Sequence, residues 1–266
     1  MYEPFFEMTR APFVSKLPVD KLYCSEKHKE ILGRLTYTAE GNRYATLTGV
    51  SGVGKSTISR MFSQSLSPEK YTVLYLADSQ LTPRMFYKGL LDQLGIEAKF
   101  YRGDAKRQLH KQLKIIREVH NRNITVIVDE AHLLDRETFE EIRFVLNTEM
   151  DSYSPMSLIL VGQNEMWDKL RMQQYAAIRG RIDLKCELQG MDRAELDAYM
   201  GAHLAYAGGK EEIFTDAAIS ELHRYSAGAA RAVNKAATHC LIYAAQCAKK
   251  LIDDTMVRTV IEAELP

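Results

Sequence analysis

The chain has 266 residues, of which 46% are hydrophobic and 26% are charged, a composition that excludes a disordered chain and is typical of a folded globular protein. Its 35 basic and 35 acidic residues cancel at pH 7, so the charge of the whole molecule does not indicate a nucleic-acid partner. Four scattered cysteines show no metal-ligand spacing and no disulfide framework, which favours a reducing, cytoplasmic location. We find no signal peptide and no run of about 18 apolar residues, and so expect no membrane segment.

The first 24 residues are rich in proline and in aromatic residues, and proline disfavours regular structure. We expect an extended arm that packs its aromatic rings onto the domain, with the alternative that part of it covers an adenine base. A capping-box-like start at Ser25, followed by apolar residues on one face, then predicts a helix.

A glycine-rich stretch lies between a strand-like run, residues 44–48, and a helix-like run that begins at Thr57. It consists of Gly49, Val50, Ser51, Gly52, Val53, Gly54, Lys55, Ser56 and Thr57. The glycines let several backbone N–H groups point at one anion, and the helix start adds partial positive charge. Lys55 can reach the β- and γ-phosphates of a nucleotide, and the Ser56 hydroxyl can bind Mg²⁺. The context therefore predicts a phosphate-binding loop rather than a plain glycine-rich turn.

The next apolar run, residues 71–77, has the pattern of a buried strand. A helix follows, opened by Thr82 and Pro83 and closed near Gly95. A basic loop then leads to a second helix, from Asp104 to about residue 120.

An acidic pair follows the strand-like run at 124–128 directly. A carboxylate at a strand tip can hold Mg²⁺ through water, while the next carboxylate polarises an attacking water. We therefore predict Asp129 as the metal-side residue and Glu130 as the general base. For His132 we favour packing or solvent exposure over a role in the site.

A helix is expected from Arg136 to about residue 150, and a strand over 157–162 that ends in Gln163 and Asn164. An amide beside the acidic pair can contact the γ-phosphate or the attacking water, and either residue could supply it. Asn164 could instead cap the next helix.

Two arginines, Arg179 and Arg181, precede a last strand over about 182–188. They could be surface charges. They could also face a neighbouring subunit's nucleotide and stabilise charge on the transferring phosphoryl group.

The pattern changes after residue 190, where no strand is predicted. Helical runs are expected at about 192–207, 215–225, 230–248 and 253–264. Arg231 stands in the first turn of the third run, where the helix dipole disfavours a cation. We therefore favour a role for Arg231 in reaching the γ-phosphate over a solvated surface position. The predicted organisation is an arm (1–24), an α/β nucleotide-binding domain (25–190) and a small helical lid (191–266).

These features together resemble the AAA+ ATPase superfamily, whose P-loop NTPase fold is a parallel sheet between helices with a helical lid. Residues 22–30, 47–49, 129–134 and 160–163 resemble the ExeA-type ATPases more closely. That family has a general-secretion branch, which carries a membrane span, and a branch that accompanies transposases and resembles MuB, TnsC and IstB. The lack of a span and the end of the chain after the lid favour the second branch.

The resemblance implies ATP hydrolysis with Mg²⁺, a homo-oligomeric ring or filament on double-stranded DNA, recruitment of a transposase and no membrane partner. The nucleotide would lie between subunits, with Arg179 or Arg181 acting in trans. Two other hypotheses stay open, namely a secretion-type ATPase and a nucleotide-dependent interaction switch with little turnover.

DNA contact is then expected from the stretch between Arg84 and Arg122, where ten Lys or Arg residues stand against four Asp or Glu, a local charge of +6. The candidates for DNA contact are Thr82, Arg84, Lys99, Arg102, Lys106 and Arg107. Such contacts would be salt-dependent and sequence-tolerant. A solvated basic helix face is the alternative.

Overall fold

The computed structural model describes residues 2–14, 16–78, 80–145, 154–209 and 211–265. Contacts divide the chain into two compact units. The first, here the α/β unit, comprises His28–Gly49 and Lys55–Leu188. The second, here the helical unit, comprises Met1–Lys27, Val50–Gly54 and Gln189–Pro266.

The α/β unit is built on a five-stranded parallel sheet in the order β2-β3-β4-β1-β5. Its strands are β1 (Tyr44–Thr48), β2 (Tyr71–Leu76), β3 (Asn123–Val128), β4 (Ser157–Gly162) and β5 (Leu184–Glu187). Each predicted strand is present, and the last is shorter than predicted. The central strands β1, β3 and β4 are almost wholly buried, as expected of parallel strands covered on both faces.

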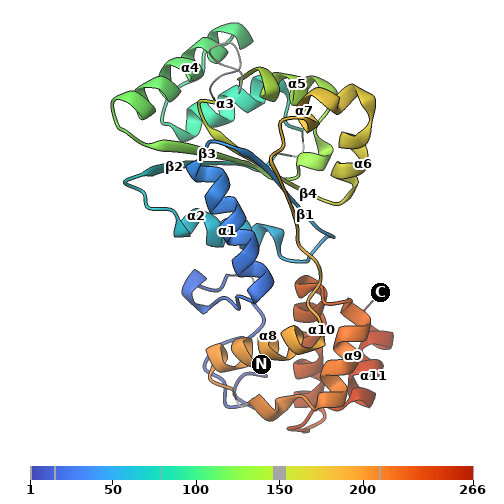
Figure 1. Cartoon of the computed structure of the whole chain (residues 1–266). Helices are drawn as coiled ribbons and strands as arrows, with labels where there is room; N and C mark the ends of the chain where they lie inside the picture. The colour runs from blue at the N-terminus through green and yellow to red at the C-terminus, as the bar shows by residue number, and fades with distance from the viewer. Residues whose placement is uncertain (1, 15, 79, 146–153, 210, 266) are drawn as a thin grey trace. The chain divides into compact units, whose positions relative to one another are not determined.

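Helices cover both faces of this sheet (Figure 1). On one side lie α1 (Glu26–Glu40) and α2 (Lys55–Ser65), and on the other α3 (Pro83–Gln93), α4 (Arg102–Glu118), α5 (Arg136–Val145), α6 (Glu165–Arg171) and α7 (Ala176–Arg179). Leu74, Val126 and Leu160 join one core with α3, α4 and α5. Ile127 and Val161, one residue out of phase, are buried on the opposite face.

Local signals set the helix ends as predicted in the first half of the unit. The Thr82 hydroxyl accepts a hydrogen bond from the N–H of Met85, 3.3 Å away, and Pro83 occupies the first helical position of α3. Gly95 follows the end of that helix with φ +74°, a conformation that favours glycine. The predicted helix beyond α4 begins at Arg136, and its predicted end at 146–150 lies outside the described residues.

The helical unit contains α8 (Arg193–Ala207), α9 (Asp216–Ser226), α10 (Ala230–Gln246) and α11 (Asp254–Glu264), each within two residues of the predicted bounds. Asp192 and Glu195 form a capping box at the start of α8, and Gly208 ends it with φ +77°. Thr215 and Asp253 cap α9 and α11. In the part of the chain that the structure describes, no helix is long and apolar enough to cross a bilayer.

The N-terminal arm packs into the core of this same unit. The side chains of Tyr2, Phe6 and Phe13 are buried there, which confirms the expected packing of its aromatic rings. The backbone N–H and the hydroxyl of Thr9 both donate to the carbonyl of Ala207, at 2.9 and 3.1 Å. The helical core is therefore made from both ends of the chain.

Candidate nucleotide-binding site

The glycine-rich loop joins the end of β1 to the start of α2. Gly52 and Gly54 adopt positive φ angles of 76° and 118°, which side chains other than glycine rarely adopt. Lys55 is the first residue of α2, and its Nζ donates to the carbonyl oxygen of Gly49 at 2.9 Å. The lysine thus folds back over the loop, where a phosphate oxygen could replace that carbonyl as its partner.

The predicted metal residues Ser56 and Asp129 meet at the carboxyl edge of the sheet. They are 73 positions apart in sequence, yet the Ser56 hydroxyl donates to Asp129 Oδ2 at 3.3 Å. Asp129 is 5% exposed, and its Oδ1 accepts the N–H of Glu130 at 2.9 Å. Parallel strands end at one edge, so the residues that follow β1 and β3 come together although β4 lies between them.

Tyr75 on β2 is a site residue that the sequence reasoning missed. Its hydroxyl donates to Asp129 Oδ2 at 2.5 Å. Burial and this hydrogen bond raise the pKa of Tyr75 above its usual range, so the phenol stays protonated and keeps donating. The register that pairs Tyr75 with Ile127, two residues before Asp129, is visible only once the strands are paired.

The donor atoms fit Mg²⁺. Hydroxyl and carboxylate oxygens are the hard ligands that Mg²⁺ takes, at about 2.0–2.1 Å. Oxygens of Ser56 and Asp129 that lie 3.3 Å apart can both reach one such ion. Nucleotide phosphates and water would supply the other ligands.

Glu130, His132 and Gln163 form a connected polar group beside these residues. Glu130 has left-handed backbone angles, φ 53° and ψ 30°, and a side chain that is 50% exposed. His132 Nδ1 lies 3.4 Å from Glu130 Oε2, and His132 Nε2 lies 3.2 Å from Gln163 Nε2. The backbone N–H of Gln163 also lies 3.5 Å from His132 Nδ1, so both ring nitrogens of His132 contact Gln163.

His132 therefore has a polar environment that its position in the sequence did not indicate. Its side chain is 10% exposed, which agrees with the expected packing and not with the alternative of solvent exposure. It is also more than a packed side chain, because it links the predicted general base to the predicted amide. The Asp-Glu-x-His spacing was the available signal, but the link to Gln163 requires that β4 lie beside β3.

The strand order favours Gln163 over Asn164 as the amide predicted to lie beside the acidic pair. Gln163 directly follows β4, which lies between β1 and β3, and so it stands between the end of β1 and the acidic pair that follows β3. Asn164 is exposed and occupies the N-cap position of α6, but its side chain makes no capping hydrogen bond. The alternative position of Asn164 as the N-cap residue is thus confirmed, although its side chain makes no capping bond.

The two arginines before β5 differ in their contacts. Arg179 Nη1 donates to the carbonyl oxygens of Leu170 and Arg171, at 3.1 and 2.7 Å, and so satisfies backbone groups at the end of α6. Arg181 lies in the turn that leads to β5, and its backbone N–H donates to the carbonyl of Ile178.

Arg231 lies in the first turn of α10 against the tip of the glycine-rich loop, within the helical unit. Its backbone N–H donates to the Gly52 carbonyl at 3.0 Å, and its Nη1 lies 3.4 Å from the Ser51 hydroxyl. A Cβ at position 52 would come within 2.8 Å of the Arg231 Cβ, so this contact as well as the positive φ requires glycine.

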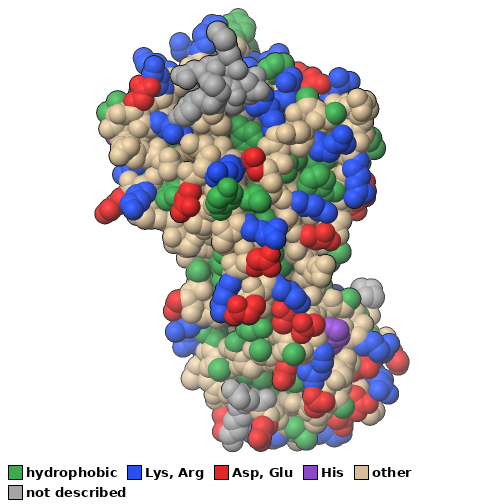
Figure 2. Space-filling view, viewed as in Figure 1, with side chains coloured by type: hydrophobic (Ala, Val, Ile, Leu, Met, Phe, Trp, Pro, Cys, Tyr) green, Lys and Arg blue, Asp and Glu red, His purple; other side chains and the backbone are tan. Residues whose placement is uncertain are grey.

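The six candidates for DNA contact lie at the starts of α3 and α4, and several are already paired. Arg102 forms an ion pair with Glu137 at 2.7 Å, and Lys106 forms one with Glu141 at 2.9 Å. Arg107 is paired with an aspartate of its own helix. Figure 2 shows Lys and Arg side chains mixed with acidic and hydrophobic ones around α4. The local excess of positive charge is therefore smaller than the residue count indicates.

The other three candidates have different environments. Thr82 uses its hydroxyl to cap α3. The Arg84 guanidinium carbon lies 4.6 Å from the centre of the Phe100 ring. Lys99 is exposed, and its backbone N–H donates to a side-chain amide of α4.

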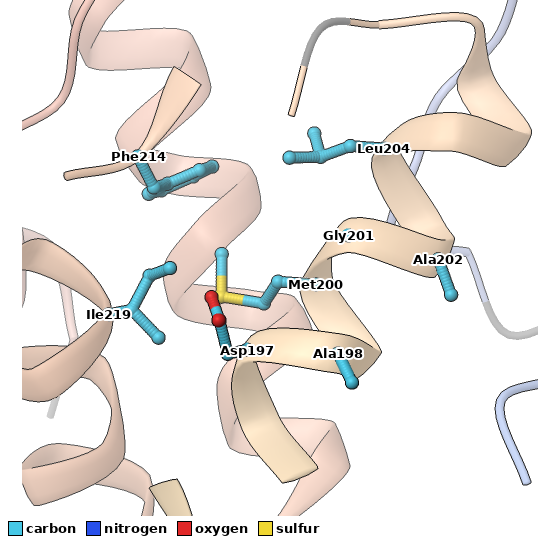
Figure 3. Close-up of a pocket in the computed structure, with 8 residues that line it drawn as sticks. All are labelled: Asp197, Ala198, Met200, Gly201, Ala202, Leu204, Phe214 and Ile219. Atoms are coloured by element: carbon cyan, nitrogen blue, oxygen red, sulfur yellow. The ribbon is translucent and has the colours of Figure 1, made fainter. Parts of the chain in front are cut away.

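A cavity of about 270 Å³ lies elsewhere, inside the helical unit. Residues of α8 line it together with Phe214 and with Ile219 of α9, and Met200, Leu204, Phe214 and Ile219 surround its interior (Figure 3). Asp197 is the acidic residue of its lining. None of the predicted site residues lines this cavity.

Comparison with protein families gives a match to a model described as AAA domain, over residues 38–170. That range contains the glycine-rich loop, the acidic pair and Gln163.

Two curated relatives match the chain. It is 32% identical over 251 residues to general secretion pathway protein A of Aeromonas hydrophila, and the aligned segment covers 92% of this chain and 45% of the relative. It is 26% identical over 176 residues to Mu-like prophage FluMu DNA transposition protein B of Haemophilus influenzae, and the aligned segment covers 64% of this chain and 57% of the relative. The chain thus spans about half the length of these relatives.

Solved structures show the same fold. The origin recognition complex protein ORC2 of Aeropyrum pernix matches with a TM-score of 0.71 at 13% identity, covering 95% of this chain and 71% of that one. A chain of the Drosophila origin recognition complex bound to DNA matches with a TM-score of 0.67 at 20% identity, covering 94% and 63%. The predicted fold, an α/β P-loop NTPase of the AAA+ type with a parallel sheet between helices, is confirmed.

Proposed function

Because this chain belongs to the AAA domain family, we propose that it hydrolyses ATP to ADP and phosphate and uses that cycle to control its assembly on double-stranded DNA. The observation that carries the ATPase part is the contact of Ser56 with Asp129, 3.3 Å apart at the edge where Lys55 also lies. A hydroxyl, a buried carboxylate and a loop lysine in this arrangement suit a nucleoside triphosphate with its metal ion.

Each residue has a part in the proposed reaction. Lys55 and the backbone N–H groups of the loop bind the β- and γ-phosphates. Ser56 and Asp129 would hold Mg²⁺, which would neutralise charge on the phosphate oxygens. Glu130 takes the proton of the attacking water, and Gln163 orients that water or the γ-phosphate.

Two arginines would complete the site. Arg231 already contacts the loop tip through Ser51, and it would turn its guanidinium to the γ-phosphate. We assign the arginine that acts on a neighbouring subunit's nucleotide to Arg181, because Arg179 caps α6. This assignment requires a homo-oligomer, either a ring or a filament, with nucleotide between subunits.

The DNA part of the proposal is supported by the basic candidates at the starts of α3 and α4 and by the Haemophilus relative, which is named as a DNA transposition protein. We propose that the protein binds DNA phosphates in its ATP-bound oligomer, in the cytoplasm, and recruits or activates a transposase. Phosphate contacts of this kind weaken as salt rises. A single subunit would bind weakly, and an oligomer would add its contacts together.

A second candidate is an ATPase of general secretion. It is favoured by the identity of 32% over 92% of the chain to the Aeromonas protein. This candidate predicts that ATP has no effect on DNA binding and that the chain associates with proteins of the cell envelope.

A gel shift with duplex DNA separates the two candidates. Wild type should shift the duplex with a slowly hydrolysed ATP analogue at low salt and not with ADP. Glu130→Gln should lower phosphate release by about 10²–10⁴-fold, as expected for loss of a general base, while keeping the ATP-dependent shift. Glu140→Gln, in a surface ion pair with Arg136, is the matched control and should leave both unchanged. Absence of any ATP-stimulated shift would remove the DNA part of the proposal.

A further inference from the structure

Two neighbouring aromatic side chains protrude from the loop before α4. Phe100 is 70% exposed and Tyr101 is 71% exposed, and their rings meet edge to face with centres 5.3 Å apart. Single exposed apolar residues are ordinary, but two large rings side by side form a surface whose burial against a ligand is favourable.

The rings sit on an anchored loop. The backbone N–H of Lys99 donates to Gln108 Oε1 at 3.1 Å, and Gln108 Nε2 donates to the carbonyl of Glu97 at 3.0 Å. The guanidinium of Arg84, from the start of α3, lies over the Phe100 ring. The loop and this stacking hold the rings outward before any ligand arrives.

The charge around the rings is positive and available. Arg84 and Lys99 are both exposed, and among the described residues no carboxylate is paired with either. Arg102, by contrast, is paired with Glu137. Arg84 and Lys99 are therefore cations near the aromatic rings that no ion pair among the described residues neutralises.

The surface lies at the same edge of the sheet as the nucleotide site. Strand β2 is parallel to its neighbours, and α3 begins after its carboxyl end, so Arg84 lies at the edge where Lys55 and Asp129 also lie. Phe100 is brought to that edge by its contact with Arg84.

Exposed aromatic rings flanked by cations suit nucleobases that are free to stack. Every base has a flat π-face, and a duplex hides those faces inside its own stack. We propose that Phe100 and Tyr101 form a stacking platform for unpaired or unstacked bases of DNA, with Arg84 and Lys99 holding the adjacent phosphates. This inference rests on the proposed DNA binding and adds to it a preference for distorted or gapped DNA over a regular duplex.

The test compares the full chain, with a slowly hydrolysed ATP analogue, on a regular duplex and on the same duplex with a short single-stranded gap. Binding is measured by fluorescence anisotropy, and 2-aminopurine placed in the gap reports stacking. Wild type should bind the gapped DNA about tenfold more tightly and quench the 2-aminopurine, in line with the strength of base–aromatic stacking. Phe100→Leu with Tyr101→Leu should remove both effects and leave regular duplex binding within about twofold.

Two controls complete the design. Phe100→Trp keeps a flat ring and should retain the preference for gapped DNA. Val119→Ala changes a side chain that is 71% exposed at the other end of α4, and it should behave as wild type.

The possible failures are distinguishable. If wild type binds both DNAs equally and the leucine variant matches it, the stacking inference is wrong while DNA binding stands. If wild type binds neither DNA, the proposed function fails. If the leucine variant loses self-association and all DNA binding to the same extent, the rings contact protein instead, and the inference is overturned.

Discussion

The α/β unit and the helical unit take their residues from the chain in different ways. Apart from the loop tip, the α/β unit runs continuously from His28 to Leu188, and its polar chemistry stands where strands end. The helical unit gathers both ends of the chain and the tip of the glycine-rich loop. Chemistry in the first unit is therefore visible as short patterns, whereas assembly of the second depends on contacts between distant segments.

The buried polar residues of the two units reflect this difference. In the α/β unit, Asp129 is buried with three donors around it and belongs to the proposed site. In the helical unit, His203 is buried between aromatic rings, and its Nδ1 donates to the carbonyl oxygen of Pro12 in the arm. The first belongs to the proposed nucleotide site, and the second joins two parts of the chain.

Among the variants that compare the two units, Lys55→Ala in the α/β unit has the largest expected effect. Loss of the charge that grips the phosphates should lower ATP hydrolysis by about 10²–10³-fold, similar to the loss of other transition-state charge stabilisers. Nucleotide affinity, measured by calorimetry, should fall as well, while hydrogen exchange in α8 to α11 stays as in wild type. Lys88→Ala, at an exposed position of α3, is the control. Unchanged affinity in Lys55→Ala would refute the assignment of the loop.

Phe6→Ala tests whether the arm is part of the helical core. Removing a ring that is 4% exposed should destabilise the helical unit by about 3–5 kcal/mol. Hydrogen exchange should rise in α8 and α11 and remain slow in β3 and β4. Phe139→Ala, in the core of the α/β unit, should give the reverse pattern. Equal loss of protection in both units from either variant would show that they unfold together.

His132→Ala tests the link between Glu130 and Gln163. Because a side chain that positions the base is lost and the phosphate grip is kept, we expect kcat to fall by about tenfold with nucleotide affinity unchanged. His132→Asn can keep a donor near Glu130, and His132→Gln can keep a partner for Gln163. If the position of Glu130 is what matters, Asn should restore more activity than Gln. A loss of affinity without a loss of kcat would contradict this role.

The smallest effect concerns pH and the helical unit. Burial lowers the pKa of His203 below its usual value, so below about pH 6.5 the unfolded chain takes up a proton that the folded ring resists. Stability of the helical unit should therefore decrease as pH falls through that range. Hydrogen exchange in α8, measured between pH 7.5 and 5.5 and corrected for the pH dependence of the intrinsic exchange rate, gives the slope of stability against pH. His203→Phe should flatten it, and an unchanged slope would assign the effect to other groups.

The sequence alone was enough to predict the strands, most helix ends, the phosphate-binding loop and the acidic pair. These are local features, because hydrophobic period, capping residues and glycines act within a few positions of each other. Thr82 with Pro83 and the four C-terminal helices are examples where short-range signals placed an element within two residues.

The tertiary structure alone decided which distant residues meet. It brought Tyr75 to Asp129 and placed His132 between Glu130 and Gln163. It likewise put the N-terminal arm into the helical core and paired Arg102 and Lys106 with acidic residues of α5. The physical reason is that strand order and side-chain contacts depend on how elements pack, and hydrophobic periodicity records which face of an element is buried but not against which partner.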